Sequence, residues 1–128
     1  MYQKASLVPG SQRRGRHINS AMGLLRSDDP APFTVINPDG PTPMLLLCDH
    51  ASRRVPLVLG NLGLDAASFD RHIAYDIGAK AVSQRLSAFL NAPLVLAGFS
   101  RLVIDLNRPA DHQDSIVVEI DSTPIPAN

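Results

Sequence analysis

Short apolar runs that end in turn-forming or polar residues dominate this sequence, and they predict strands. Phe33–Ile36 is aromatic and β-branched and is followed by several turn residues, which predicts an edge strand. The run Leu45–Cys48 ends in Asp49 and His50, which predicts a buried strand at about 43–48. Three later apolar runs predict further strands, at 93–97, 102–106 and 116–120.

Helical spacing is present between residues 65 and 90. Five apolar residues recur there at the spacing of one helix face: Ala79, Val82, Leu86, Phe89 and Leu90. Asn91 and Pro93 are expected to end this helix, because asparagine tolerates the left-handed conformation and proline cannot continue the hydrogen-bond ladder. Gly78 predicts a break into two helices, with Asp76 capping the second. A shorter helix is predicted at 55–60.

The order of these elements predicts an α/β layered fold. A strand, a long helix and a second strand in succession are typical of a right-handed crossover between parallel strands. The runs at 93–97 and 102–106 are too close for an intervening helix, so we expect antiparallel neighbours and therefore a mixed sheet. Ligands bind at the carboxyl ends of strands in such sheets, which makes His50 the first candidate site residue.

Residues 1–32 differ in character from the rest of the chain. Basic residues precede the first acid at Asp28, and serine, glycine and proline interrupt any apolar period, which predicts a disordered basic tail closed by a linker at 28–32. An organellar transit peptide is an alternative, and Arg13–His17 could contact phosphate. The folded domain is predicted to cover 33–128.

Composition narrows the class of protein. With 128 residues, 45% of them hydrophobic, and a formal net charge of +0, the chain is expected to form one soluble domain. It offers no general attraction to nucleic acid or membranes, and no run approaches the about 20 apolar residues of a membrane-spanning helix, so a cytoplasmic location is expected. The single cysteine, Cys48, lies in an apolar run and is expected to pack in the core.

Several polar residues are candidates for chemistry, and each has a structural alternative. His72, Asp76 and Lys80 would share one helix face, or simply form a solvated row of charges. A lone histidine such as His50 is often only a hydrogen-bonded core residue. Four residues alternate along one side of a predicted strand, where the first and third could form a structural ion pair: Arg101, Val103, Asp105 and Asn107.

Five motifs together resemble the N-formylglutamate amidohydrolase family, in the family's order from about Phe33 onward. They are Cys48–Ser52 with Val55 and Pro56, Leu62–Leu64, Arg71–Ala79, Ser100–Pro109 and Ile125–Asn128. The resemblance implies a phosphorylase/hydrolase-like, three-layer α/β/α domain with a mixed, mostly parallel sheet, related to the zinc carboxypeptidases and aspartoacylases. It also implies hydrolysis of N-formyl-glutamate to formate and glutamate.

The resemblance also implies roles for particular residues and a divalent metal, expected to be zinc. A bound metal lowers the pKa of its water and so provides a nucleophile, and arginine suits the carboxylates of an N-acyl amino acid substrate. The implied assignments are His50 and Asp76 as metal ligands and catalytic residues, Arg101, Asn107 and Arg108 as substrate-binding residues, and Asp49, Ser52 and His72 as residues supporting the metal site.

The sequence departs from the family in length. Family members are much longer, and the third metal ligand is absent from this chain; Arg53 stands where the carboxypeptidase group places a glutamate ligand. We therefore expect weak metal binding and no activity from this chain alone. Two alternatives are a zinc amidase or carboxypeptidase-like enzyme acting on another acylated amino acid or peptide, and a non-catalytic truncated product. An incomplete sheet would expose an edge strand and favour self-association.

Overall fold

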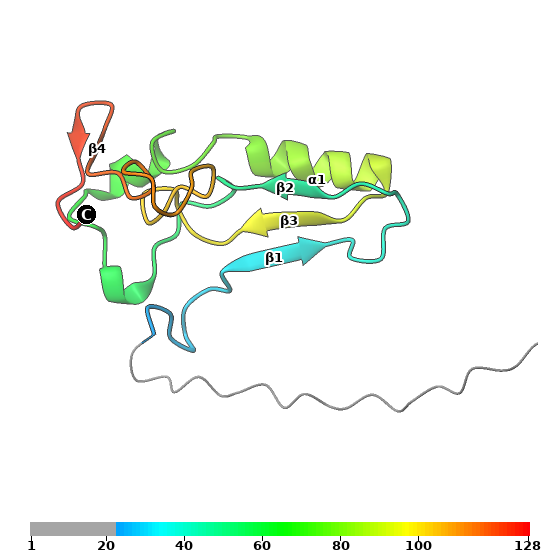
Figure 1. Cartoon of the computed structure of the whole chain (residues 1–128), viewed down its shortest axis with the longest axis horizontal. Helices are drawn as coiled ribbons and strands as arrows, with labels where there is room; N and C mark the ends of the chain where they lie inside the picture. Colours follow the sequence, from blue (N-terminus) through cyan, green and yellow to red (C-terminus); the bar gives the residue numbers. More distant parts are fainter. Residues whose placement is uncertain (1–22) are drawn as a thin grey trace, which may run out of the picture.

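A mixed three-stranded sheet with one helix against it forms the ordered frame of the molecule. The computed structural model describes residues 23–128, and the part of the predicted tail at 1–22 lies outside this range. Strands β1 (Phe33–Ile36), β2 (Leu46–Cys48) and β3 (Leu94–Ala97) are arranged in the order β1-β3-β2 (Figure 1). Central strand β3 pairs antiparallel with β1 and parallel with β2, which confirms the predicted edge strand, crossover and mixed sheet.

The two faces of this sheet differ. Leu94 and Leu96 of β3 are buried together with Cys48 of β2, and Ala79 at the start of α1 (Ala79–Leu90) packs against this cluster. The burial of Cys48 confirms the packing role predicted for it. Side chains alternate across a strand, so Val95 points to the other face, where its register partners Val35 and Leu47 are 44% and 64% exposed. Within residues 23–128, no element therefore covers this apolar face of the sheet.

Helix α1 begins later than a continuous helix from residue 65 would. Gly78 precedes it with φ +87°, and Asn91 follows it in the left-handed conformation with φ 48°, as predicted for its end. The predicted break is confirmed, but the predicted cap is wrong because Gly78, with no side-chain hydrogen bond, occupies the N-cap position. Much of the apolar stripe also faces solvent, and Phe89 is 86% exposed.

The segment before α1 is mostly turns, which changes the neighbours of its polar residues. A short 3-10 helix, η2 (Ala66–Asp70), is followed by irregular chain up to Gly78. His72, Asp76 and Lys80 consequently do not share a helix face, and that prediction is wrong. Among residues 23–128, no helix is long and apolar enough to cross a membrane.

A second apolar core lies among the loops beside the sheet. Its buried members come from four separate segments: Leu62, Leu64, Ala74, Leu102 and Ile125. The 3-10 helix η1 (Leu57–Leu59) borders it and stands in place of the predicted helix at 55–60. Of the strand predicted at 116–120, only β4 (Glu119–Ile120) forms, and it pairs in a hairpin with β5 (Thr123–Pro124), which was not predicted.

The strand predicted at 102–106 is wrong, and so is its pairing with 93–97. The chain turns at this point, with the Val103 amide donating to the Ser100 carbonyl at 3.0 Å. Leu102 is buried in the second core and Asp105 is also buried, and successive turns, not a strand, place both residues. Because no strand forms, Arg101, Val103, Asp105 and Asn107 do not line one side of it.

The segment before β1 lies against the end of β3. The Gly98 amide donates to the Pro32 carbonyl at 2.8 Å, and a Cβ at Gly98 would collide with the Ala31 carbonyl oxygen. Asp29 Oδ1 accepts from the Leu57 amide at 2.7 Å. Residues 29–32 are thereby joined both to the end of β3 at Gly98 and to Leu57.

Replacing Leu94, which is fully buried at the centre of the sheet, should destabilise the fold strongly. We expect Leu94→Ala to lower the free energy of unfolding in urea by about 2–5 kcal/mol through lost burial and a residual cavity. The matched control is Phe89→Ala on exposed α1 surface, expected to change it by less than about 0.5 kcal/mol. Equal effects of the two substitutions would contradict the described core.

Candidate functional site

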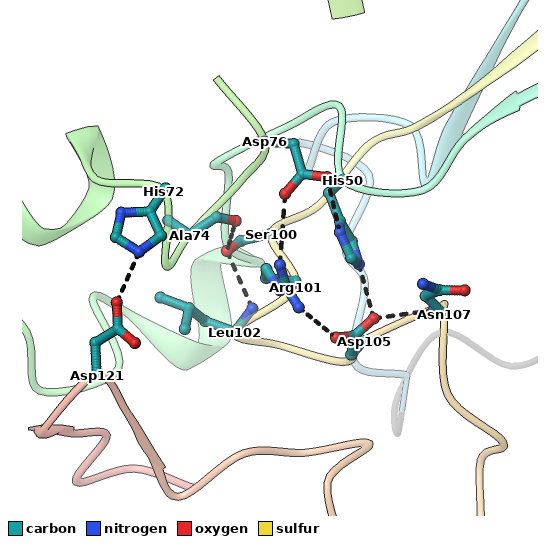
Figure 2. A network of polar contacts seen from close by, with 10 residues as sticks. All are labelled: His50, His72, Ala74, Asp76, Ser100, Arg101, Leu102, Asp105, Asn107 and Asp121. Carbon is teal, nitrogen blue, oxygen red and sulfur yellow. Dashed lines mark hydrogen bonds and ion pairs between the residues drawn. The ribbon is translucent and has the colours of Figure 1, made fainter. Parts of the chain in front are cut away.

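His50 lies between two carboxylates just beyond the carboxyl end of β2. It is 7% exposed, and each ring nitrogen faces a different acid (Figure 2). Nδ1 lies 3.3 Å from Asp76 Oδ2, and Nε2 lies 2.7 Å from Asp105 Oδ1. This places the imidazole at the meeting point of three chain segments that are distant in sequence.

Asp105 is the most enclosed member of this arrangement, at 4% exposure. Besides His50, its Oδ1 accepts from the Asn107 amide at 2.9 Å, and its Oδ2 accepts from Arg101 Nη2 at 2.9 Å. Its own amide donates to the Ser115 carbonyl at 2.7 Å. Both carboxylate oxygens are thus hydrogen-bonded, which is how a protein offsets the cost of burying a charge.

Arg101 closes the arrangement into a ring. Its Nη1 reaches Asp76 Oδ1 at 3.4 Å while its Nη2 binds Asp105, so the guanidinium bridges the same two acids as His50. We call His50, Asp76, Arg101 and Asp105 the four-residue cluster. The Asp76 side chain is 53% exposed, so the cluster opens to solvent on that side.

Hydrogen bonds to main-chain groups hold the three loops of the cluster together. The Asp76 amide donates to the His50 carbonyl at 3.1 Å. The buried Ser100 hydroxyl donates to the Ala74 carbonyl at 2.7 Å and accepts from the Leu102 amide at 3.1 Å (Figure 2). These contacts lie directly beside the cluster in sequence, so its geometry does not depend on the polar side chains alone.

The surroundings of Asp105 favour its ionised form. Burial raises its pKa, but hydrogen bonds from His50, from the Asn107 amide and from Arg101, with the attraction of His50, outweigh burial and lower the pKa below the ordinary 3.8. Asp105 is therefore a carboxylate at neutral pH.

The structure brings together only some of the residues singled out in the sequence. His50, Asp76 and Arg101 meet, and Asn107 contributes its amide to Asp105. Arg108 is exposed and donates to the Asn107 carbonyl at 3.3 Å. Sequence reasoning treated Asp105 only as the ion-pair partner of Arg101; that pair is present, but the contact with His50 was missed. Its position inside the Ser100–Pro109 motif was the available signal.

The three residues expected to support the site lie elsewhere or make other contacts. His72 pairs with Asp121 at 2.6 Å on the surface, away from the cluster (Figure 2). Ser52 Oγ accepts from the Arg54 amide at 3.2 Å. Asp49 forms no hydrogen bond with His50 among the described residues, as expected for neighbours whose side chains diverge.

The donor atoms fit two positions of a metal site. Among residues 23–128, no group of three or more histidine, cysteine or acidic residues is placed to hold a metal ion. His50 Nδ1 and Asp76 Oδ2, which lie 3.3 Å apart, are an imidazole nitrogen and a carboxylate oxygen, donor types that zinc would bind. The Asp105 carboxylate on the opposite ring nitrogen is the partner that metal-binding histidines usually have.

Asp105→Asn should destabilise the fold in a pH-dependent way. Because the pKa of Asp105 is lower in the folded state, its stabilisation is present above its ordinary pKa of 3.8 and is lost as pH falls through the lowered value. We expect a loss of about 3–5 kcal/mol near neutral pH, since His50 and Arg101 lose their buried partner. Urea unfolding from about pH 7 to about pH 3 should show the difference from the unsubstituted chain shrinking with acidity.

The control for this measurement is Asp39→Asn, which changes an exposed carboxylate in the turn after β1. It should leave both the unfolding free energy and its pH dependence close to those of the unsubstituted chain. A difference between Asp105→Asn and the unsubstituted chain that is constant across the pH range would contradict the assigned ionisation of Asp105.

Comparison with known proteins gives this geometry a family. Residues 42–128, which contain all four members of the cluster, match the family model described as N-formylglutamate amidohydrolase. No curated protein compared with the chain matches it. A solved structure, the crystal structure of gene product Atu2144 from Agrobacterium tumefaciens, is 36% identical with a TM-score of 0.78 over 81% of this chain. The chain spans 41% of the length of that protein. Since the family model covers most of the chain and includes the loops that build the cluster, the chain belongs to the N-formylglutamate amidohydrolase family.

Proposed function

We propose that this chain carries part of the active site of a metal-dependent amidohydrolase that cleaves N-formyl-glutamate to formate and glutamate. The observation that carries the proposal is His50 held between Asp76 and Asp105, with one ring nitrogen on the solvent-open side of the cluster. Family membership supports an amide-hydrolysing activity. The surrounding domain is proposed to be the three-layer α/β/α type related to zinc carboxypeptidases, of which the sheet and α1 form a portion.

His50 and Asp76 are the proposed metal ligands, and zinc is the proposed metal. Bound zinc would supply a Lewis acid and a water of lowered pKa. Asp105 holds the proton on Nε2 of His50, which leaves the lone pair of Nδ1 directed toward Asp76. The buried carboxylate thus fixes both the ring orientation and the tautomer that metal binding requires.

Arg101 and Arg108 differ in what they can bind. Arg101 already uses Nη1 on Asp76 and Nη2 on Asp105, so its role in the proposal is to position these two carboxylates. Arg108 is exposed in the loop that follows Asp105 and, as proposed, binds a substrate carboxylate, with Asn107 beside it. An N-acyl amino acid therefore remains the proposed substrate class.

Zinc should bind this chain weakly and through His50. Titration followed by calorimetry is expected to give one site that His50→Gln and Asp76→Asn each abolish, because each removes one of two ligands. Asp105→Asn should weaken zinc binding by about 10–100-fold, since the ring loses its orienting partner.

The matched control for the zinc titration is Asp121→Asn, which removes the exposed carboxylate paired with His72. It should leave zinc affinity unchanged, because neither residue belongs to the cluster. Zinc affinity that is insensitive to His50 and Asp76 would contradict the proposed ligands.

Formate release tests the reaction. With zinc present, we expect the Agrobacterium relative to release formate from N-formyl-glutamate in a chelator-sensitive way. We expect this chain alone to release none, because residues 23–128 supply two proposed ligands instead of three. Chelator-sensitive release by this chain would overturn its expected inactivity. A relative inactive on N-formyl-glutamate but active on other acylated amino acids or peptides would favour the broader zinc amidase or carboxypeptidase-like function.

A further inference from the structure

Strand register gathers apolar side chains on the face of the sheet opposite α1. Val35, Val95 and Leu47 are neighbours across the three strands, and Phe33 is paired with Ala97 two residues further along. Leu45 lies two residues before Leu47, so alternation places it on the same face. Four of these six side chains are strongly exposed: Phe33 at 57%, Val35 at 44%, Leu45 at 59% and Leu47 at 64%. We call these six residues the bare face.

Helix α1 presents a second apolar surface that its own sheet does not cover. Val82, Leu86 and Phe89 recur at i, i+4 and i+7, so they share one stripe of the helix. They are 58%, 43% and 86% exposed, whereas the small residue Ser87 is fully buried. We call these three residues the α1 stripe.

One molecule cannot bring its own two surfaces together. Ala79 of α1 packs against the sheet core of Cys48, Leu94 and Leu96, and alternation directs the bare face to the other side of the same sheet. A second copy can bring them together. A helix about 10–12 Å across matches three strands spaced about 4.8 Å apart, so one helix suffices to cover the bare face.

Charge favours the same pairing. Helix α1 carries Lys80 and Arg85 and no acidic residue. The bare face is uncharged, and within three residues of either end of the three strands the only charged residues are Asp39 and Asp49. A basic helix would thus dock on a face flanked by acids, where opposite charges favour association.

We propose that the α1 stripe of one copy docks on the bare face of a second copy, so that the chain associates head to tail. The seven exposed side chains of the two surfaces amount to roughly 300–600 Å² of apolar area. Stable interfaces bury about 1,200–2,000 Å² in total, about 60% of it apolar, so this contact is a weak and concentration-dependent one. Each added copy still offers one free surface of each kind, and the association therefore continues past the dimer. The inference goes beyond the proposed hydrolysis, because neither a metal nor the four-residue cluster takes part in it.

Sedimentation equilibrium of the full chain without metal tests the association. We expect the average mass to rise with concentration, from one copy at low micromolar concentration to more than two copies near millimolar concentration. Phe89→Glu and Leu47→Glu should each weaken the association at least about tenfold, since each puts a charge into an apolar contact. Val118→Glu is the matched control, because Val118 is 64% exposed like Leu47 but belongs to neither surface, and it should associate like the unsubstituted chain.

Mixing the two weakened variants tests which surface meets which. The Phe89→Glu chain keeps its bare face and the Leu47→Glu chain keeps its α1 stripe, so an equimolar mixture should form a one-to-one pair that grows no further. Should either variant lower the urea midpoint, Phe89→Ser and Leu47→Ser repeat the measurement without an added charge.

Three results would overturn the proposal. The first is the mass of a single copy at every concentration, which would leave the bare face to another occupant, such as residues 1–22 or a different protein. The second is association that Phe89→Glu leaves intact, because α1 would then not be the element that docks. The third is a mixture of the two weakened variants that forms no pair.

Discussion

The buried contact between His50 Nε2 and Asp105 Oδ1, at 2.7 Å, is the interaction on which the rest of the site depends. It joins the end of β2 to a loop 55 residues further along the chain. A buried carboxylate is costly unless its oxygens are satisfied, and Arg101 and the Asn107 amide supply the remaining hydrogen bonds. The chain around Asp105 therefore supplies hydrogen bonds to both oxygens of this carboxylate. The carboxylate in turn orients the His50 ring toward Asp76.

Packing on two sides brings these polar groups together. The sheet core, with Leu94 and Leu96, fixes the end of β2 and hence His50. The second core, with Ala74 and Leu102, fixes the loops that carry Asp76 and Arg101. The cluster thus takes His50 from beside the sheet core and Asp76 and Arg101 from beside the second core, where the Ser100 hydroxyl links Ala74 to Leu102. Its geometry is a product of apolar packing as much as of charge.

Regular elements could be predicted from the sequence, whereas loops could not. The strands at β1, β2 and β3 were recognisable because apolar runs bounded by turn residues describe a sheet, and Asn91 marked the end of α1 because few residues adopt its conformation easily. The helix face predicted for His72 and Asp76 was wrong because the chain between η2 and Gly78 forms turns, although Gly78 itself correctly predicted where α1 begins. Asp105 was placed on a strand because apolar and polar residues alternate around it. That alternation gives no information about the partner of a buried carboxylate, which is His50. The order of the family motifs identified His50, Asp76 and Arg101 as site residues, which the spacing of apolar residues could not do. A motif identifies a loop residue even when the conformation of the loop is unknown.

The close approach of the chain at Gly98 has a consequence for how this sequence can vary. Gly98 carries no charge and touches no member of the cluster, yet the carbonyl of Ala31 occupies the space that any side chain there would need. Any other residue must displace the chain around Ala31. Ala31 and Gly98 both line a pocket of about 640 Å³, which three basic side chains also line, those of Arg53, Arg54 and Lys80. A neutral glycine just after β3 thus restrains the shape of a cavity that basic side chains also line. A substitution at residue 98 would therefore change the shape of the pocket without replacing any residue of the cluster.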